Sequence, residues 1–376
     1  MTAARTLLPG RASGEGTRRY ADRVAGLAAG HFRELAGGAS ASTLGLGTYL
    51  GPEDGETDVL YQDAIVRALE RGVNVLDTAV NYRHQRSERA IRTALGTAIG
   101  RGVARRDEVV VATKGGFIPF DGGVPRDPRA YFAATYVETG IIKPGEVVKG
   151  AHCMTPRYLH DQIDRSRANL GLETLDVYYV HNPETQLGEL DRAEFMTRVR
   201  AAFGALEEAV AAGRIARYGT ATWTGYRVDP GDPGYLSLPD LVAAARDVGG
   251  ADHHFKVIQL PYNLGMTEAF TRANQRVNDR VVPVLEAARA LDISVMASAS
   301  LHQGQLMRLP PVMAEYIPGL TTDAQRALQF VRSTPGVSTA LVGMKTAAHV
   351  DENATLGSTS PMAWKHFQRL FSAAGG

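Results

Sequence analysis

Short apolar runs rich in β-branched residues alternate with longer stretches whose apolar residues recur at every third or fourth position. The first such stretch, residues 60–69, is typical of an amphipathic helix, and Arg71-Gly72 ends it. We predict one helix that begins at Ser87 and further helices over residues 156–170, 195–210, 239–248, 281–291 and 323–332. The apolar runs predict strands over residues 42–47, 73–77, 109–114, 175–181, 215–220, 257–260, 293–297 and 339–342.

Apolar strands that alternate with helices indicate a parallel sheet buried on both faces. Eight such units in one uninterrupted series favour a closed barrel over an open doubly wound sheet, and 376 residues suit a barrel of this kind. An open nucleotide-binding sheet would carry a Gly-x-Gly-x-x-Gly turn after an early strand. Here Gly45-Leu46-Gly47 is followed by Thr48-Tyr49-Leu50. The sequence therefore predicts an α/β fold of the (β/α)8 TIM barrel class.

Two segments lie outside the alternation. Residues 1–30 are polar and Arg-rich, so we expect a partly disordered N-terminal extension with one weak helix over residues 20–29. The barrel domain would then cover residues 31–376 and end in a C-terminal helix. Residues 115–155 form a long loop after the third strand, and its aromatic residues favour packing over the barrel mouth. The pattern leaves open whether this loop forms the pocket or joins the subunits of a homo-oligomer.

Composition narrows the class of protein. Lys and Arg total 41 against 40 Asp and Glu, and this balance excludes a strong general attraction to nucleic acid or anionic membrane. No apolar run approaches the roughly 20 residues of a transmembrane helix, and the N-terminus lacks the apolar segment of a signal peptide. The single cysteine, Cys153, excludes an internal disulfide and a multi-thiolate metal site. We expect a cytoplasmic protein without a metal centre.

Titratable residues end three consecutive predicted strands. Asp77, Lys114 and His181 close the second, third and fourth strands, and Tyr82 follows in the loop above Asp77. Catalytic side chains of barrel enzymes lie at these strand ends. An ammonium whose charge is held by a carboxylate favours the phenolate of a neighbouring tyrosine and tunes it as an acid. An imidazole opposite can polarise a carbonyl oxygen. Each residue alone has an ordinary structural explanation, and their conjunction indicates a catalytic site.

These residues lie in segments that resemble the aldo-keto reductase family. The matching segments, within about residues 31–355, are Leu44-Gly45-Leu46-Gly47-Thr48, Leu76-Asp77-Thr78-Ala79-Val80-Asn81-Tyr82, Ala112-Thr113-Lys114, Asp176-Val177-Tyr178-Tyr179-Val180-His181, Gln259-Leu260-Pro261-Tyr262-Asn263 and residues 342–353. The resemblance implies that Tyr82 is the general acid that protonates a carbonyl oxygen as hydride arrives from a nicotinamide. Lys114 and Asp77 would lower its pKa, and His181 would orient the substrate.

The resemblance also implies an NADP(H) or NAD(H) cofactor. NADP(H) is favoured because Lys345 and His349 offer cations for a 2′-phosphate. Residues at family cofactor positions are Gly47, Thr48, Asp77, Thr222, Gln259, Ser298, Leu301, Gly304, Gly343, Lys345, His349, Glu352 and Asn353. Two positions depart from the family pattern: Ala221-Thr222 replaces a Ser-Asn pair, and Ser298 replaces an aromatic residue that stacks on the nicotinamide.

We expect Tyr49, Arg83 and Trp223 to contact the substrate, and the cations after Tyr82 to favour an anionic or hydroxyl-rich compound. The leading hypothesis is an NADP(H)-dependent oxidoreductase that interconverts a carbonyl and an alcohol on a small polar or sugar-like substrate. Two alternatives keep the same site: a redox-neutral epimerase with a retained nicotinamide cofactor, and a non-catalytic nucleotide-sensing subunit. A barrel hydrolase is disfavoured, since paired carboxylates or histidine clusters are missing from the predicted strand ends.

Overall fold

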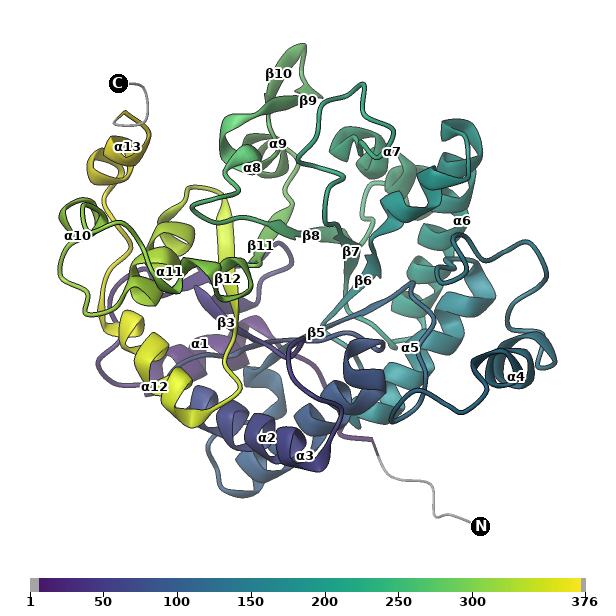
Figure 1. Cartoon of the computed structure of the whole chain (residues 1–376), viewed down its shortest axis with the longest axis horizontal. Coiled ribbons are helices and arrows are strands. Elements are labelled where there is room, and N and C mark those ends of the chain that lie inside the picture. The colour runs from purple at the N-terminus through teal and green to yellow at the C-terminus, as the bar shows by residue number, and fades with distance from the viewer. Residues whose placement is uncertain (1–6, 373–376) are drawn as a thin grey trace.

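The computed structural model describes residues 7–372, in which eight parallel strands close into a barrel (Figure 1). Each strand pairs with the next along the chain, and the last pairs with the first to close the barrel. In chain order the barrel strands are β3 (Leu44–Gly47), β4 (Val75–Asp77), β5 (Val110–Gly115), β6 (Val177–His181), β7 (Tyr218–Ala221), β8 (Phe255–Pro261), β11 (Ser294–Ser298) and β12 (Val337–Gly343). The predicted fold class is confirmed.

The barrel strands are buried on both faces, which is why they appear in the sequence as continuous apolar runs. Inward-facing side chains pack together inside the barrel; they include Val75, Val110, Ala112, Val177, Tyr179, Val257, Met296 and Leu341. Outward-facing neighbours pack against the surrounding helices; they include Leu46, Leu76, Val111, Val180, Ile258 and Val295.

The helices surround the barrel (Figure 1). Between the barrel strands lie α2 (Gly55–Glu70), α3 (Arg86–Gly100), α5 (Pro156–Leu170), α6 (Arg192–Ala211), α7 (Leu238–Gly249), α8 (Glu268–Thr271), α9 (Val284–Ala290), α10 (Met313–Tyr316) and α11 (Asp323–Ser333), followed by α12 (Ala347–Ala354) and α13 (Trp364–Ser372). Their ends follow local chemistry: Asp54 caps α2 by accepting from the Thr57 N–H at 2.8 Å, and Gly171 ends α5 with a φ of 68°. Within residues 7–372, no helix combines the length and apolar character needed to cross a membrane.

One helix prediction was too long. Residues 281–283 belong to a hairpin of β9 (Ala273–Val277) and β10 (Arg280–Pro283), and the helix begins only at residue 284. Asn278 and Asp279 form the turn, with φ of 48° and 63°, a left-handed conformation that these two residue types tolerate. The Asn-Asp pair is a turn signal, and the chain follows it although the apolar residues Val281 and Val282 also fit the start of the predicted helix.

The N-terminal segment packs against the end of the barrel opposite the strand C-termini. Its helix, α1 (Gly14–Arg23), begins and ends earlier than the predicted one, because Ser13 caps it by accepting from the Gly16 N–H. A hairpin of β1 (Phe32–Glu34) and β2 (Ser40–Ser42) follows. Contacts such as the ion pair between Arg19 and Asp107, at 2.7 Å, hold this segment in place from residue 7 onward. Residues 1–6, which also belong to the segment expected to be partly disordered, lie outside the described residues.

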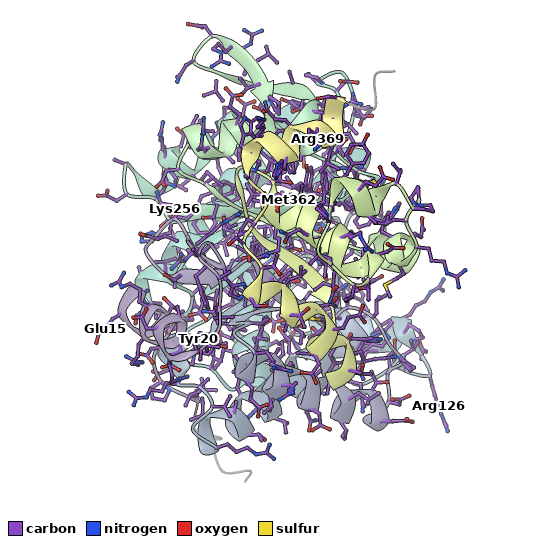
Figure 2. All side chains as sticks on the ribbon, turned by 90° about the vertical axis from the view of Figure 1, so that its left-hand side faces the viewer. Glu15, Tyr20, Arg126, Lys256, Met362 and Arg369 are labelled. Atoms are coloured by element: carbon purple, nitrogen blue, oxygen red, sulfur yellow. The ribbon has the colours of Figure 1, made fainter. Side chains whose placement is uncertain are left out.

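The long loop after β5 contains α4 (Pro128–Phe132) and a short π-helix, η3 (Ala133–Val137), and lies at the outer edge of the molecule beside α5 (Figure 1). Its aromatic side chains bury one another there, with the Tyr136 ring 6.1 Å from that of Tyr158 on α5. The prediction that the loop covers the barrel mouth was therefore wrong for most of its length. Figure 2 places Arg126 of this loop on the side opposite Glu15 and Tyr20 of the N-terminal segment.

Candidate active site

A cavity of about 660 Å³ opens at the C-terminal ends of the barrel strands. The last residues of six strands line it: Gly47, Asp77, His181, Ala221, Ser298 and Gly343. The other predicted site residues that line the cavity are Tyr49, Tyr82, Thr222, Trp223, Gln259, Leu301, Gly304, His349, Glu352 and Asn353. Parallel strands thus bring together side chains from the whole chain at one mouth.

A buried ion pair lies beneath the phenol of Tyr82. The Lys114 ammonium donates to Asp77 Oδ2 at 2.7 Å and to the Thr78 carbonyl at 2.8 Å, and Gln259 donates to Asp77 Oδ1 at 2.7 Å. Burial lowers the pKa of Lys114, but the Asp77 carboxylate and Tyr82 more than offset it, so the pKa lies above the ordinary value. The Lys114 Nζ lies 4.9 Å from the centre of the Tyr82 ring. A fixed cation is therefore in place beside the phenol.

The pKa of Tyr82 differs from the expectation. Burial raises it and is the largest effect, the Lys114 ammonium lowers it, and the Asp77 carboxylate raises it. The net shift of the Tyr82 pKa is upward. Of the two residues that were expected to lower this pKa, Lys114 and Asp77, only Lys114 does so. Tyr82 consequently keeps its proton at neutral pH, as a proton donor must.

His181 faces Tyr82 across the mouth, with ring centres 5.8 Å apart. Burial lowers the pKa of His181 well below its ordinary value, and the Lys114 ammonium and His152 lower it further. Its Nδ1 is buried and has no hydrogen-bond partner among the described residues. The imidazole is therefore neutral and adjacent to the proton that Tyr82 carries.

A residue that the sequence reasoning missed, His152, supports His181 from behind. Its Nε2 donates to the His181 carbonyl at 2.7 Å, because Gln186 donates to Nδ1 at 2.8 Å and so leaves the proton on Nε2. Arg198 donates to Oε1 of the Gln186 side chain at 3.0 Å, and this bond fixes the orientation of the Gln186 amide. Gly116 is required at this contact: its φ is 149°, and a Cβ would lie 2.8 Å from His152 Nε2.

Several residues that line the cavity carry a buried polar atom without a partner. Besides His181 Nδ1 and Asn81 Oδ1, these are Thr222 Oγ1, directly after β7, and Asn353 Oδ1 on α12; none has a hydrogen-bond partner in the described part of the chain. The loop after β11 also lines the cavity and turns sharply, with φ of 53° at Gln303 and 91° at Gly304. Turns of this kind form concave surfaces whose free N–H groups bind anions; here the Gly304 N–H donates to the Leu301 carbonyl at 2.9 Å. A ligand that carries an anionic group would suit such a turn.

Four predicted residues do not line the cavity, and one of them is Lys114, which lies beneath Tyr82. Thr48 is buried behind β4, where its N–H and Oγ1 both bond the Asp77 carbonyl. Lys345 is half-buried outside the lining. Arg83 points away from the mouth: its guanidinium pairs with Asp58 at 2.7 Å and donates to the carbonyls of residues 52 and 54. Arg83 was expected to contact the substrate, but in this structure it does not reach the cavity, because Asp58 on α2 holds its guanidinium.

Other lining residues were not predicted as site residues. They are Leu50, Asn81, Phe117, Asn182, Ser300, Gln303, Met307, Ala324, Leu341 and Val342, together with Ala299. Asn182 directly follows a strand-end residue and Asn81 directly precedes Tyr82, so the strand-end argument could have included both. The loop residues carry no such local signal. Among residues 7–372, no group of three or more His, Cys, Asp or Glu could hold a metal ion.

Comparison with characterised proteins gives a distant relative. The 6-dehydroglucose reductase of Novosphingobium aromaticivorans is 26% identical over 196 residues, which are 51% of this chain and 52% of that protein. The match thus spans about half the length of the curated relative.

The fold matches solved aldo-keto reductases along nearly the whole chain. A Klebsiella pneumoniae aldo/keto reductase, solved in complex with NADP and acetate, is 21% identical with a TM-score of 0.60, covering 91% of this chain and 95% of that one. The glycerol dehydrogenase of Gluconobacter oxydans is 18% identical with a TM-score of 0.60, covering 92% and 95%. A model of the aldo/keto reductase family matches residues 43–309. The chain therefore belongs to the aldo/keto reductase family.

Proposed function

We propose that this protein is an NADP(H)-dependent oxidoreductase that interconverts a carbonyl and an alcohol on a small, hydroxyl-rich substrate. The observation that carries the proposal is the protonated Tyr82 above the buried Lys114–Asp77 pair, with the neutral His181 opposite. Family membership supports the reaction class.

The cavity suits a nicotinamide dinucleotide. The unpartnered Thr222 Oγ1 would hold the carboxamide, the turn at Gln303-Gly304 would face the pyrophosphate, and Asn353 with Glu352 would contact the adenine. His349 lines the adenosine end and Lys345 follows the adjacent strand end, so both are candidates for a 2′-phosphate. A related Klebsiella pneumoniae structure holds NADPH. The bound cofactor would supply or accept the hydride.

The protein's own side chains transfer the proton, stabilise the charge that forms and orient the substrate. Tyr82 donates its proton to the carbonyl oxygen during reduction and takes it back from the alcohol during oxidation. Lys114 stabilises the phenolate that remains, and Asp77 holds the ammonium in place. His181, being neutral, donates a hydrogen bond that orients the carbonyl. These roles need no other titratable group.

The walls beside Tyr82 support an uncharged substrate. Tyr49, Phe117 and Trp223 are aromatic, and Asn81 and Asn182 add amides. No lysine or arginine lines the cavity in the described chain. Because Arg83 does not reach the cavity, these walls favour a hydroxyl-rich substrate over an anionic one. Two relatives act, by their names, on hydroxyl-rich compounds, namely 6-dehydroglucose and glycerol.

The test is the Tyr82→Phe variant, compared with Tyr49→Phe as the matched control. Tyr49 also lines the cavity and lies 4.9 Å from Tyr82, ring centre to ring centre. NADPH oxidation would be followed over a panel of hydroxylated aldehydes, with the alcohol product identified. We expect kcat to fall by about 10²- to 10⁴-fold for Tyr82→Phe, with NADPH binding retained, and to change little for Tyr49→Phe.

Undiminished turnover of Tyr82→Phe would refute the assignment of the acid. Product formation without net NADPH loss would indicate a redox-neutral epimerase. NADPH binding without turnover of any panel member would favour a nucleotide-sensing subunit.

A further inference from the structure

The main chain of Trp223 is held on both sides by charged residues, one from the preceding loop and one from its own loop. Its N–H donates to Glu184 Oε1 at 2.8 Å, and its carbonyl accepts from Arg227 Nη1 at 3.1 Å. Glu184 lies in η4 (Pro183–Gly188), the turn that follows β6. Arg227 is itself paired with Glu268 on α8, at 3.0 Å. These hydrogen bonds and this ion pair thus connect the loops that follow β6, β7 and β8 around Trp223.

Glu184 makes this contact at a cost to stability. Its Oε1 also accepts from the Thr224 N–H at 3.2 Å, but its Oε2 is buried and has no partner among the described residues. Burial raises the pKa of the Glu184 carboxyl, although the main-chain N–H groups oppose the shift. A buried carboxyl oxygen without a partner destabilises the folded chain. Such unfavourable arrangements concentrate at functional sites.

The side chain of Trp223, whose main chain these contacts hold, is exposed and lines the cavity. The indole of Trp223 is 41% exposed, and it lines the cavity together with His181 and Asn182. Tyr49 and Phe117 add aromatic surface to the same mouth. A large apolar ring that is fixed at its backbone but uncovered by its own chain is suited to contact a ligand.

We propose that Glu184 is a specificity-determining positioning residue, which holds Trp223 as the wall against which the ring of an uncharged, hydroxylated cyclic substrate lies. This inference rests on the proposed function and specifies its substrate class. The aliphatic C–H face of a pyranose packs on an indole, and its hydroxyl groups would find the amides of Asn81 and Asn182 in the same lining. A three-carbon aldehyde has no ring face with which to cover the indole.

The test compares Glu184→Ala, Glu184→Gln, Trp223→Ala and the double Ala variant on two aldehydes. One is methyl glucopyranoside oxidised to the aldehyde at C6, and the other is glyceraldehyde. For Glu184→Ala we expect KM for the ring aldehyde to rise about tenfold, with kcat and the kcat/KM for glyceraldehyde nearly unchanged. Glu184→Gln keeps an acceptor oxygen and should restore wild-type behaviour. The double variant should be no worse than Trp223→Ala.

Three results would overturn the inference. If Glu184→Ala lost activity equally on both aldehydes, the role of Glu184 would be structural only. Additive effects of the two alanine substitutions would mean that Glu184 does not act through Trp223. If the wild type preferred glyceraldehyde, Trp223 would not act as a wall for a substrate ring.

A binding measurement keeps the inference testable even if the proposed reaction is wrong. Trp223 and Trp364 are the two tryptophans of the chain, so in a Trp364→Phe background the fluorescence reports on Trp223 alone. Quenching by methyl glucopyranoside would measure contact with the wall without turnover. We expect Glu184→Ala to weaken this binding about tenfold, and an unchanged or undetectable response in all variants would contradict the proposal.

Discussion

Replacing Lys114 by methionine should destabilise the folded chain, because it leaves a buried carboxylate without its cation. The side chains of Lys114 and Asp77 are 0% and 7% exposed, and their charged atoms lie 2.7 Å apart. Among residues 7–372, only the Gln259 amide, at 2.7 Å, would still hydrogen-bond the Asp77 side chain. Breaking a buried ion pair by removing one partner typically costs about 3–5 kcal/mol. We expect a loss of this size in the free energy of unfolding.

The assay is urea unfolding followed by circular dichroism for the wild type, Lys114→Met, Asp77→Asn and the double variant. In the double variant a neutral amide no longer needs the ammonium, so it should recover much of the stability that Lys114→Met loses. A Lys114→Met loss below about 1 kcal/mol, or strictly additive losses, would refute the reasoning. Both outcomes would mean that the pair is solvated in solution. Turnover should be lost in either case, because nothing then stabilises the Tyr82 phenolate.

Two further predictions follow from buried charges. Burial lowers the pKa of both His31 and His152 to about 4, whereas the unfolded chain takes up these protons near pH 6.5. Stability should therefore fall as pH drops from about 6.5 to 4, by at most about 3 kcal/mol per histidine; urea titrations at several pH values test this, and His152→Gln should flatten the decline. A decline that His152→Gln leaves unchanged would contradict the assignment. Because Arg83 is paired with Asp58, benzaldehyde should be reduced with a higher kcat/KM than 4-carboxybenzaldehyde, and the reverse order would indicate an unrecognised cation.

The local sequence pattern predicted the positions of the strands and indicated the candidate catalytic residues. The eight apolar runs were visible because each barrel strand is buried on both faces, and Asp77, Lys114 and His181 stood out because they end such runs. A barrel has one place where strand ends meet, so their convergence followed from the topology alone. The hairpin turn at Asn278-Asp279 was also readable, but the helical period of the next residues competed with it.

What the chain's own pattern determined was therefore the order of elements, their closure into a barrel and the residues at strand ends. The tertiary structure decided which groups pair across the sequence. From the sequence alone Arg83 resembles a free cation, but in the structure it is paired with Asp58 on α2. From the sequence alone Glu184 resembles a surface acid, but in the structure it accepts a hydrogen bond from the Trp223 N–H in the loop after β7. The physical reason is that burial and hydrogen bonding between distant segments depend on distances in space. Local periodicity specifies only which face of an element is apolar.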